Sequence, residues 1–358
     1  MRKKVGILSA GAWGTALGKV LAEKKCGIQI WDYLPEVVED INLRHTNSRF
    51  LLGVSLPRNF TASKNILEVV KGKDYLLLAT PSLYLVDVVK KIVKAPNIRE
   101  GKTPIGILAK GFISTEEGPE LITTALEEHL PPHYRNNLVY ISGPSHAEEV
   151  ARGKLTGLIS ASLNGRNSIL FRELLSSPSL MVFSSFDVAG VQTAAAVKNV
   201  IAIAFGMLDA LMGIYELFGD NTESLLLAAG LNEIQLIGKA LGSTHPETFT
   251  SIAGVGDLDV TCRSRYGRNR RFGREIITDN ILFDYKSLDD LIENIAELGY
   301  LPEGIVACKH VNTIAEKNRL KLPVSGTVYS VLNRESEPLD AVKNMLKSIT
   351  GDFPEDGV

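Results

Sequence analysis

Short apolar runs alternate with helical patterns through the first half of the chain. Residues 5–8 and 27–31 are rich in β-branched and aliphatic side chains, whereas residues 15–25 between them follow a helical period. The run 74–80 is almost continuously apolar, as expected of a strand that is buried on both faces of a parallel sheet. Shorter runs of the same kind follow at residues 105–109, 138–142, 158–162 and 180–183. The pattern predicts an α/β domain over residues 1–186, with a doubly wound, mostly parallel sheet.

The longest helical pattern covers residues 187–211, where Ala, Val, Ile and Leu dominate and Asp187 can cap the first turn. Lys198 is the only ionisable residue between positions 188 and 208. A buried ammonium needs a partner or a chemical task, and burial would lower its pKa into the range of a proton-transfer group. The alternative is a lysine whose stem packs while its tip reaches water. Polar residues inside the helix and the lack of flanking aromatic belts speak against a membrane span.

The second half of the chain shows no strand pattern. Helical runs are predicted at residues 222–241, 288–298, 304–318, 322–332 and 339–348, and the last eight residues are expected to be loose. We therefore expect an all-α second domain over residues 187–358.

A glycine turn follows the first strand, in the segment SAGAWG. Its third and sixth residues, Gly11 and Gly14, match the last two glycines of the fingerprint G-x-G-x-x-G, whereas Ser9 takes the place of the first. Strand, turn and helix together favour a dinucleotide-binding Rossmann unit, with Ser9, Gly11, Ala12 and Gly14 near the coenzyme. The alternative is an ordinary strand-to-helix turn.

Asp32 ends the second strand, eighteen residues after Gly14. An acid at this position commonly binds the ribose hydroxyls and disfavours a 2′-phosphate, so the sequence predicts a preference for NAD over NADP. The alternative is that Asp32 caps the helix that follows it.

Three later strands end in residues suited to ligand binding. Pro81 follows the third strand, Lys110 the next one, and the turn from Gly143 to His146 the one after that. Because ligands bind at the carboxyl ends of parallel strands, these residues are expected at one edge of the sheet. Lys110 can alternatively be an ordinary solvated lysine.

Six arginines fall within twelve residues of the second half, at positions 263, 265, 268, 270, 271 and 274, and are punctuated by Gly267 and Gly273. We expect a flexible cationic loop whose planar donors suit phosphate. A nucleic-acid contact, with Tyr266 and Phe272 stacking on bases, is the alternative. The net charge of −2 provides no basic surface elsewhere to support it.

The bulk composition adds two limits. A length of 358 residues accommodates two domains with separate cores. Three widely spaced cysteines argue against a disulfide framework or a Cys-based zinc site, and they suit a reducing, cytoplasmic compartment.

Together the motifs resemble the bacterial type of NAD(P)-dependent glycerol-3-phosphate dehydrogenases. The matching segments run nearly end to end: GAWGTAL, ATPS, AKGF, ISGPSHAEEVA, AAAVKNVIAIA, FGDN, AGVGDLDVTC, GRNRRFG and PEG. The resemblance implies a Rossmann domain, a helical domain and an active site between them. It also implies a homodimer that reversibly reduces dihydroxyacetone phosphate with NAD(P)H to sn-glycerol 3-phosphate, a glycerophospholipid precursor.

The resemblance also implies individual roles. Lys198 is the catalytic base, Asp257 binds the substrate near it, and Lys110 touches both coenzyme and substrate. The implied substrate contacts are Gly143 and Ser145, with Gly267, Arg268 and Asn269 around the phosphate. The implied coenzyme contacts are Trp13, Tyr33, Ala147, Arg268, Leu301 and Glu303. No metal is implied.

The chain departs from the family pattern at Ser9, at Gly267 where many members have Ser, and at Leu155 where Pro is common. Segments 210–217 and 278–288 are longer than usual.

In the predicted mechanism Lys198 donates a proton to the ketone oxygen while Lys110 stabilises the developing charge and lowers the pKa of Lys198. A related dehydrogenase of another hydroxy acid would keep Lys198 but have no use for Arg268 and Asn269. A dinucleotide sensor without activity is the third possibility.

Overall fold

The structure, a computed structural model, describes residues 2–264 and 266–350. Arg265 and the tail 351–358, for which the sequence analysis made predictions, lie outside the described residues. The chain forms two compact units: unit 1 comprises residues 1–113 and 121–191, and unit 2 residues 114–120 and 192–358.

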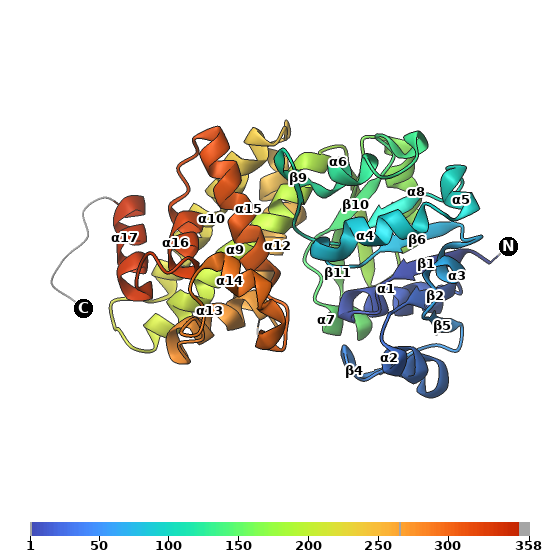
Figure 1. The fold of residues 1–358 in the computed structure, drawn as a ribbon, viewed down its shortest axis with the longest axis horizontal. Helices are drawn as coiled ribbons and strands as arrows, with labels where there is room; N and C mark the ends of the chain where they lie inside the picture. The colour runs from blue at the N-terminus through green and yellow to red at the C-terminus, as the bar shows by residue number, and fades with distance from the viewer. Residues whose placement is uncertain (1, 265, 351–358) are drawn as a thin grey trace. The chain divides into compact units, whose positions relative to one another are not determined.

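Unit 1 is built on an eight-stranded sheet, in the order β12-β11-β10-β7-β6-β1-β2-β5 (Figure 1). Six neighbouring strands from β10 to β5 are parallel, and β11 runs antiparallel to β10. The predicted mostly parallel sheet is thus confirmed. The bounds are β1 (Lys4–Leu8), β2 (Gly27–Trp31), β5 (Phe60–Ser63), β6 (Tyr75–Leu78), β7 (Ile105–Ile107), β10 (Val139–Ser142), β11 (Thr156–Ala161) and β12 (Leu180–Ser185).

Short helices and two hairpins connect these strands. The hairpins pair β3 (Thr46–Asn47) with β4 (Leu51–Ser55), and β8 (Phe112–Thr115) with β9 (Gly118–Leu121). The helical segments are α1 (Ala12–Glu23), α2 (Pro35–Glu39), η1 (Asp40–Arg44), α3 (Ile66–Val70), α4 (Ser82–Ile92), α5 (Pro96–Arg99), α6 (Ile122–Glu127), η2 (Pro132–Tyr134), α7 (Ala147–Ala151) and α8 (Gly165–Leu175). The apolar pattern of the sequence does not predict the hairpins or β5, because each of these strands is short and few of them alternate cleanly between apolar and polar residues.

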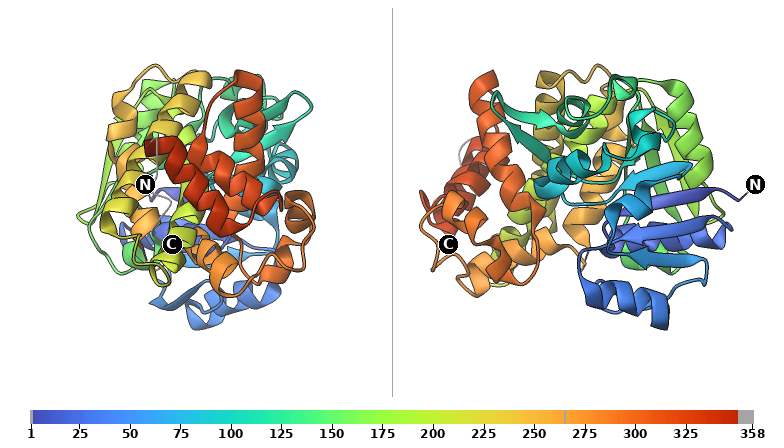
Figure 2. Two further views of the ribbon diagram at one scale, coloured as in Figure 1. Left: turned by 90° about the vertical axis from the view of Figure 1, so that its left-hand side faces the viewer. Right: turned by 45° about the vertical axis from the view of Figure 1, so that its right-hand side comes forward.

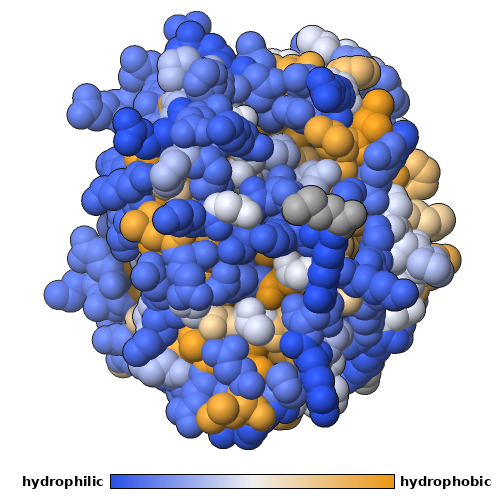
Figure 3. All heavy atoms as spheres, turned by 90° about the vertical axis from the view of Figure 1, so that its right-hand side faces the viewer, coloured by the Kyte–Doolittle hydropathy of each residue, from blue (hydrophilic) through white to orange (hydrophobic). Residues whose placement is uncertain are grey.

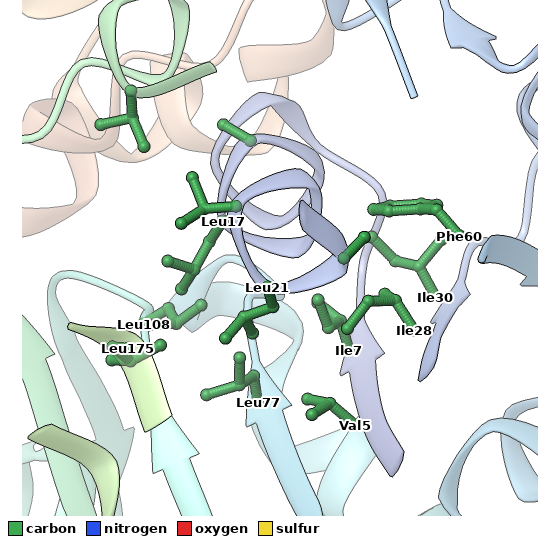
Figure 4. Packing of buried hydrophobic residues seen from close by; sticks show 14 of the residues in the cluster. Val5, Ile7, Leu17, Leu21, Ile28, Ile30, Phe60, Leu77, Leu108 and Leu175 are labelled. Carbon is green, nitrogen blue, oxygen red and sulfur yellow. The ribbon is translucent and has the colours of Figure 1, made fainter. Parts of the chain in front are cut away.

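Helix α1 lies on the sheet and organises the core of unit 1 (Figure 4). Leu21 points toward Leu77 of β6, Leu17 lies on the side of Leu108, and Leu17, Leu21 and Leu77 are fully buried. Burying each such side chain stabilises the fold by about 1.5 to 3 kcal/mol. Gly14 allows the close approach, because a Cβ there would meet the carbonyl oxygen of Ser9 at 2.4 Å. Gly14, the third glycine of the fingerprint, therefore serves the close packing of α1 on the sheet.

The surface of unit 1 is mainly hydrophilic on the face that carries the N-terminal end of the chain (Figure 3). Apolar side chains on this face form several separate patches and no continuous one, as is usual for the solvated surface of a globular protein.

Unit 2 consists almost entirely of helices (Figures 1 and 2). They are α9 (Val188–Met212), α10 (Asp220–Ala240), α11 (Glu247–Thr250), η3 (Ile252–Gly256), α12 (Asp257–Arg263), α13 (Arg268–Thr278), α14 (Leu288–Glu293), η4 (Ile295–Leu298), α15 (Glu303–Asn318), α16 (Pro323–Leu332) and α17 (Pro338–Thr350). The predicted helical second half is confirmed.

The long helix α9 begins as predicted, with the Asp187 carboxylate accepting the amide hydrogen of Gly190 at 2.9 Å. Among the described residues it is the one helix long and apolar enough to cross a membrane, but 89% of its most apolar window is buried within the protein. Such burial is typical of the core helix of a globular protein.

The arginine-rich segment is not the flexible loop that we predicted. Among the described residues, Arg263 ends α12, and Arg268, Arg270, Arg271 and Arg274 belong to the eleven-residue helix α13. Gly273, one of the glycines that suggested a loop, serves packing instead, because a Cβ there would meet the carbonyl oxygen of Ile203 on α9 at 2.1 Å. Gly206 on α9 makes the reciprocal approach to Arg270, so α9 and α13 pack backbone to backbone.

Candidate active site

The glycine turn joins β1 to α1 at the carboxyl end of the central strand. Gly11 caps α1, and a Cβ at Gly11 would meet only the Ser9 hydroxyl, at 3.7 Å. The space beside Gly11 is therefore open to a ligand. The first amide groups of a helix lack partners within the helix and attract anions, so the turn from Gly11 to Gly14 suits a pyrophosphate.

Asp32 follows β2, as predicted, but its carboxylate points into the protein. The residue is only 4% exposed, and its two oxygens accept the amide hydrogens of Ala10 at 3.0 Å and Leu34 at 3.1 Å. Burial raises the pKa of this carboxyl, while the two backbone hydrogen bonds act in the opposite direction. It does not cap α2, whose N-cap, Leu34, has no side-chain cap bond. A ribose contact of Asp32 stays a prediction.

The other predicted residues of unit 1 follow parallel strands. Because β6, β7 and β10 run parallel to β1, Pro81, Lys110 and Gly143 lie after strand ends at the same edge of the sheet as the glycine turn. Gly143 has a φ of +135°, which favours glycine, and a Cβ there would meet the carbonyl oxygen of Gly157 at 2.7 Å. The turn is tightened by the Ser145 hydroxyl, which donates to the Gly143 carbonyl at 2.9 Å.

Three further predicted coenzyme contacts of unit 1 lie beside these turns. Trp13 is the second residue of α1, and Ala147 is the first of α7. Tyr33 follows Asp32 and is 72% exposed, which leaves its ring accessible to a ligand.

In unit 2 the Lys198 ammonium is held by two side chains of α12. Lys198 is 5% exposed and donates to the Asp257 carboxylate and to the Thr261 hydroxyl, the latter at 2.8 Å. Asp257 is 1% exposed, so this ion pair is shielded from water. The alternative of a lysine whose tip reaches solvent is therefore wrong. The arrangement places a proton donor against a carboxylate in a low-dielectric site, where both the charge and the geometry are fixed.

Thr261 was missed by the sequence analysis. It lies one helical turn after Asp257, donates to the Asp257 backbone carbonyl at 2.6 Å and accepts from Lys198. The available signal was the spacing of four residues, which puts Asp257 and Thr261 on one face of a helix.

The predicted phosphate triplet lies at the start of α13. Gly267 caps the helix, and Arg268 and Asn269 are its first two residues. An N-terminus of this kind attracts anions through its amide groups and dipole, and Arg268 is exposed and makes no ion pair with another described residue. The two features together fit a phosphate group.

The Asn269 side chain is hydrogen-bonded within unit 2, and its phosphate contact stays a prediction. Its amide nitrogen donates to Asn199 Oδ1 at 3.0 Å, and its Oδ1 accepts the Gly304 amide hydrogen at 2.9 Å. The side chain is buried and ties α13 to α9 and to the start of α15. Asn199, adjacent to Lys198, was also missed. Glu303, a predicted coenzyme contact, begins α15 beside this link, and Leu301 precedes it by two residues.

Most other arginines of the segment are paired with carboxylates. Arg270 binds Asp209 on α9 through two nitrogens, each at 2.7 Å, and Arg271 binds Glu275 at 2.6 Å. Arg263 binds Asp259 at 2.7 Å. These pairs fix α12 and α13 and leave Arg268 and Arg274 as the described arginines of the segment that form no ion pair with a described residue.

Comparisons with known proteins identify the family. The N-terminal model of NAD-dependent glycerol-3-phosphate dehydrogenase matches residues 4–168, and the C-terminal model of the same family matches residues 187–343. The chain belongs to this family. The resemblance inferred from the motifs is thereby confirmed.

Individual glycerol-3-phosphate dehydrogenases are similar along nearly their whole length. An NAD(P)+ enzyme of this name from Treponema denticola is 54% identical over 356 residues, which cover 98% of this chain and 100% of that one. The enzyme from Enterococcus faecalis is 34% identical over 348 residues, covering 97% and 96%. The crystal structure of the Coxiella burnetii enzyme has 28% identity and a TM-score of 0.82, covering 97% and 99%.

Proposed function

We propose that this chain is a glycerol-3-phosphate dehydrogenase that reduces dihydroxyacetone phosphate to sn-glycerol 3-phosphate with NAD(P)H, reversibly. The observation that carries the proposal is the buried Lys198–Asp257 pair in a chain of this family. A ketone reduction needs one proton at the oxygen for each hydride at carbon, and a buried ammonium held by a carboxylate and a hydroxyl is a suitable donor.

Lys198 is the proton donor in reduction and the acceptor in oxidation. Asp257 and Thr261 hold its ammonium in one orientation, because both belong to the same helical turn of α12. Asp257 also balances the positive charge of Lys198, which would otherwise be costly to bury. Lys110 stabilises the negative charge that develops on the ketone oxygen, a role that rests on the family resemblance.

The substrate phosphate binds at the start of α13. Arg268 supplies a guanidinium that matches phosphate geometry, and the helix N-terminus adds amide donors. Gly267 lets the backbone approach the anion without a side chain in between. Asn269 holds α13 in place through its link to Asn199, and the binding energy of the phosphate helps to orient the carbonyl group.

The coenzyme site is the glycine turn of unit 1 with the neighbouring strand ends. The open space beside Gly11 and the N-terminus of α1 fit the pyrophosphate of NAD(P). Trp13 is the second residue of α1, and Tyr33 follows Asp32 after the neighbouring strand β2. When bound, the nicotinamide coenzyme supplies the hydride. Residues 1–186 thus serve as the coenzyme domain and residues 187–358 as the substrate and catalytic domain.

The oligomeric state, the metabolic role and the cellular location are also part of this proposal. A homodimer and a role in glycerophospholipid precursor synthesis follow from the family resemblance. A cytoplasmic location is supported by three buried cysteines without disulfides, which suit a reducing compartment.

The direct test is to follow NADH absorbance with dihydroxyacetone phosphate as substrate. Rapid, substrate-dependent loss of NADH, with glycerol 3-phosphate as the product, is expected. Faster loss of NADH with the keto form of another phosphorylated or carboxylated hydroxy acid than with dihydroxyacetone phosphate would contradict the proposal and favour a related dehydrogenase. Binding of NADH with no turnover of any ketone would favour a dinucleotide sensor.

A further inference from the structure

Ser9 has a backbone conformation that usually requires glycine. Its φ is +96°, a region that L-residues rarely adopt because the Cβ clashes with the backbone. The strain lies at the first position of the glycine fingerprint, immediately before the open space at Gly11. Such a conformation persists only where the surrounding structure holds it in place.

Three buried side chains hold the peptide groups next to Ser9. The Asp32 carboxylate accepts the Ala10 amide hydrogen at 3.0 Å, while the Ala10 carbonyl accepts from Thr15 Oγ1 at 3.1 Å and from Asn47 Nδ2 at 2.7 Å. Asn47 also donates to the Thr15 hydroxyl at 2.8 Å. All three residues are buried, so both polar atoms of Ala10 are fixed from within the protein.

The second oxygen of Asp32 accepts the Leu34 amide hydrogen at 3.1 Å, which orients the carboxylate toward the turn. A hydrogen bond from a backbone amide to a buried carboxylate is charge-assisted, so it restrains the turn more strongly than a neutral acceptor would. The same hydrogen bonds direct the oxygens into the protein. Those bonds therefore serve the turn and leave the carboxylate poorly placed for a ribose hydroxyl.

We propose that Asp32 is a positioning residue for the glycine turn. Together with Asn47 and Thr15 it holds Ser9 and Ala10 in the strained conformation that keeps Gly11 open to the pyrophosphate, and it does not discriminate between NADH and NADPH. The proposal rests on the assignment of this turn as the coenzyme site. It replaces the prediction that Asp32 selects NAD by contact with the ribose.

Asp32→Asn tests the proposal, because an Asn side chain must direct its NH2 group at one of the two backbone amides. The dissociation constants of NADH and NADPH are measured by fluorescence titration. We expect both constants to rise by the same factor, about tenfold, since a charge-assisted hydrogen bond is lost at the turn. The ratio between the two coenzymes is expected to stay within about twofold of the wild-type ratio.

Asn47→Ala removes an uncharged support of the same peptide group. It is expected to raise both dissociation constants in parallel, as Asp32→Asn does, although it changes no charge near the coenzyme.

Glu233→Gln is the matched control for Asp32→Asn. Glu233 is a buried carboxylate of unit 2 that accepts the amide hydrogens of Val324 at 2.5 Å and Ser325 at 2.9 Å. The control should lower the melting temperature and leave both dissociation constants unchanged.

Ser9→Gly provides a readout that a general loss of stability would not give. Glycine adopts a φ of +96° without strain, so the turn then depends less on Asp32. We expect Ser9→Gly to restore most of the coenzyme affinity when it is combined with Asp32→Asn. Should Asp32→Asn fail to fold, the coenzyme affinities of Asn47→Ala with and without Ser9→Gly make the same comparison.

Two results would overturn the proposal. The first is a selective gain of NADPH over NADH affinity in Asp32→Asn, because it would assign Asp32 to the 2′ position. The second is unchanged affinity for both coenzymes in Asp32→Asn and Asn47→Ala. Failure of the underlying coenzyme site looks different: Gly11→Ala would then bind NADH as tightly as the wild type does.

Discussion

The glycine turn of unit 1 is assembled mainly from residues close together in sequence, whereas the lysine site of unit 2 joins side chains 59 and 63 residues apart. The turn offers backbone amides and open space beside Gly11. The lysine site offers charged side chains that are buried and paired. The glycine turn suits an anionic cofactor that binds and dissociates in each catalytic cycle, and the lysine site suits a proton that is held at one atom.

Substitutions at the two sites should also change different kinetic properties. A change in the turn should affect coenzyme affinity, whereas a change in the lysine site should affect turnover. Variants that mix the two effects would show that the division of roles is wrong.

Lys198→Ala is expected to lower kcat by at least about 10² to 10⁴, since general acid–base catalysis contributes about that much. The variant leaves Asp257 buried without its cation, so Lys198→Met, which keeps most of the volume, serves as a second version of the same test. Initial rates of NADH oxidation with saturating dihydroxyacetone phosphate give kcat. A variant that retains more than about a tenth of wild-type kcat would exclude Lys198 as the proton donor.

Arg268→Ala is expected to raise KM for dihydroxyacetone phosphate by about 10- to 100-fold and to lower kcat as well, because hydrogen bonds to a charged group contribute about 1.5 to 3 kcal/mol. Arg274→Ala is the control. It removes a neighbouring exposed arginine that forms no ion pair with a described residue, and it should cause at most a small, salt-dependent loss in kcat/KM.

Unphosphorylated dihydroxyacetone tests whether Arg268 acts on the phosphate group of the substrate. The wild type should reduce it very poorly, and Arg268→Ala should reduce it no worse than the wild type does. An equal loss on both substrates would mean that Arg268 is structural and that the phosphate binds elsewhere.

Gly11→Ala is expected to raise the dissociation constant of NADH by about tenfold or more, because its Cβ would occupy the space left for the pyrophosphate. The protein itself has room for that Cβ, so the melting temperature should change little. Gly14→Ala is the matched contrast. Its Cβ would meet the Ser9 carbonyl oxygen at 2.4 Å, so stability should fall by about 1 to 3 kcal/mol. Equal losses of stability in both variants would contradict this assignment of roles.

The buried pair of His310 and Ser114 in unit 2 should affect stability without affecting turnover near neutral pH. The Ser114 hydroxyl lies 2.8 Å from His310 Nε2, and burial, aided by the charge of Lys309, lowers the pKa of His310 to about 4. The unfolded chain takes up a proton near pH 6.5 while the folded chain does not. Stability from this group is therefore complete above pH 6.5 and falls as the pH drops toward 4.

Urea denaturation at pH 7 and pH 5 measures this effect. We expect the wild type to lose about 2 kcal/mol more than His310→Gln does between these two values, because Gln can keep the contact with Ser114 but does not titrate. The same pH dependence in both proteins would assign it to other groups.

The sequence predicted those elements whose structure depends on residues close together in the chain. The parallel strands, the glycine turn and α9 follow from apolar runs and from the positions of Gly11 and Gly14, because strand burial and helix capping are decided within a few residues. The start of α9 at its Asp187 cap is one example.

What the sequence did not predict depends on contacts between distant segments. The arginine-rich segment was expected to be a loop, since its glycines look like breakers until one knows that Gly273 packs on α9. The direction of the Asp32 carboxylate depends on the conformation of Ser9 and Ala10. The spacing of four residues puts Thr261 on one helix face with Asp257, but the contacts of Thr261 with Lys198 and of Asn199 with Asn269 depend on how the helices pack.

The central claim is that unit 1 binds the coenzyme and that Lys198 of unit 2 transfers the proton. Its most direct test is to measure NADH affinity and turnover of dihydroxyacetone phosphate on the same preparation of Lys198→Ala. The account predicts a dissociation constant for NADH within about twofold of the wild-type value and a kcat lowered by at least about 10². Loss of NADH binding to the same extent as turnover, or turnover close to that of the wild type, would contradict it.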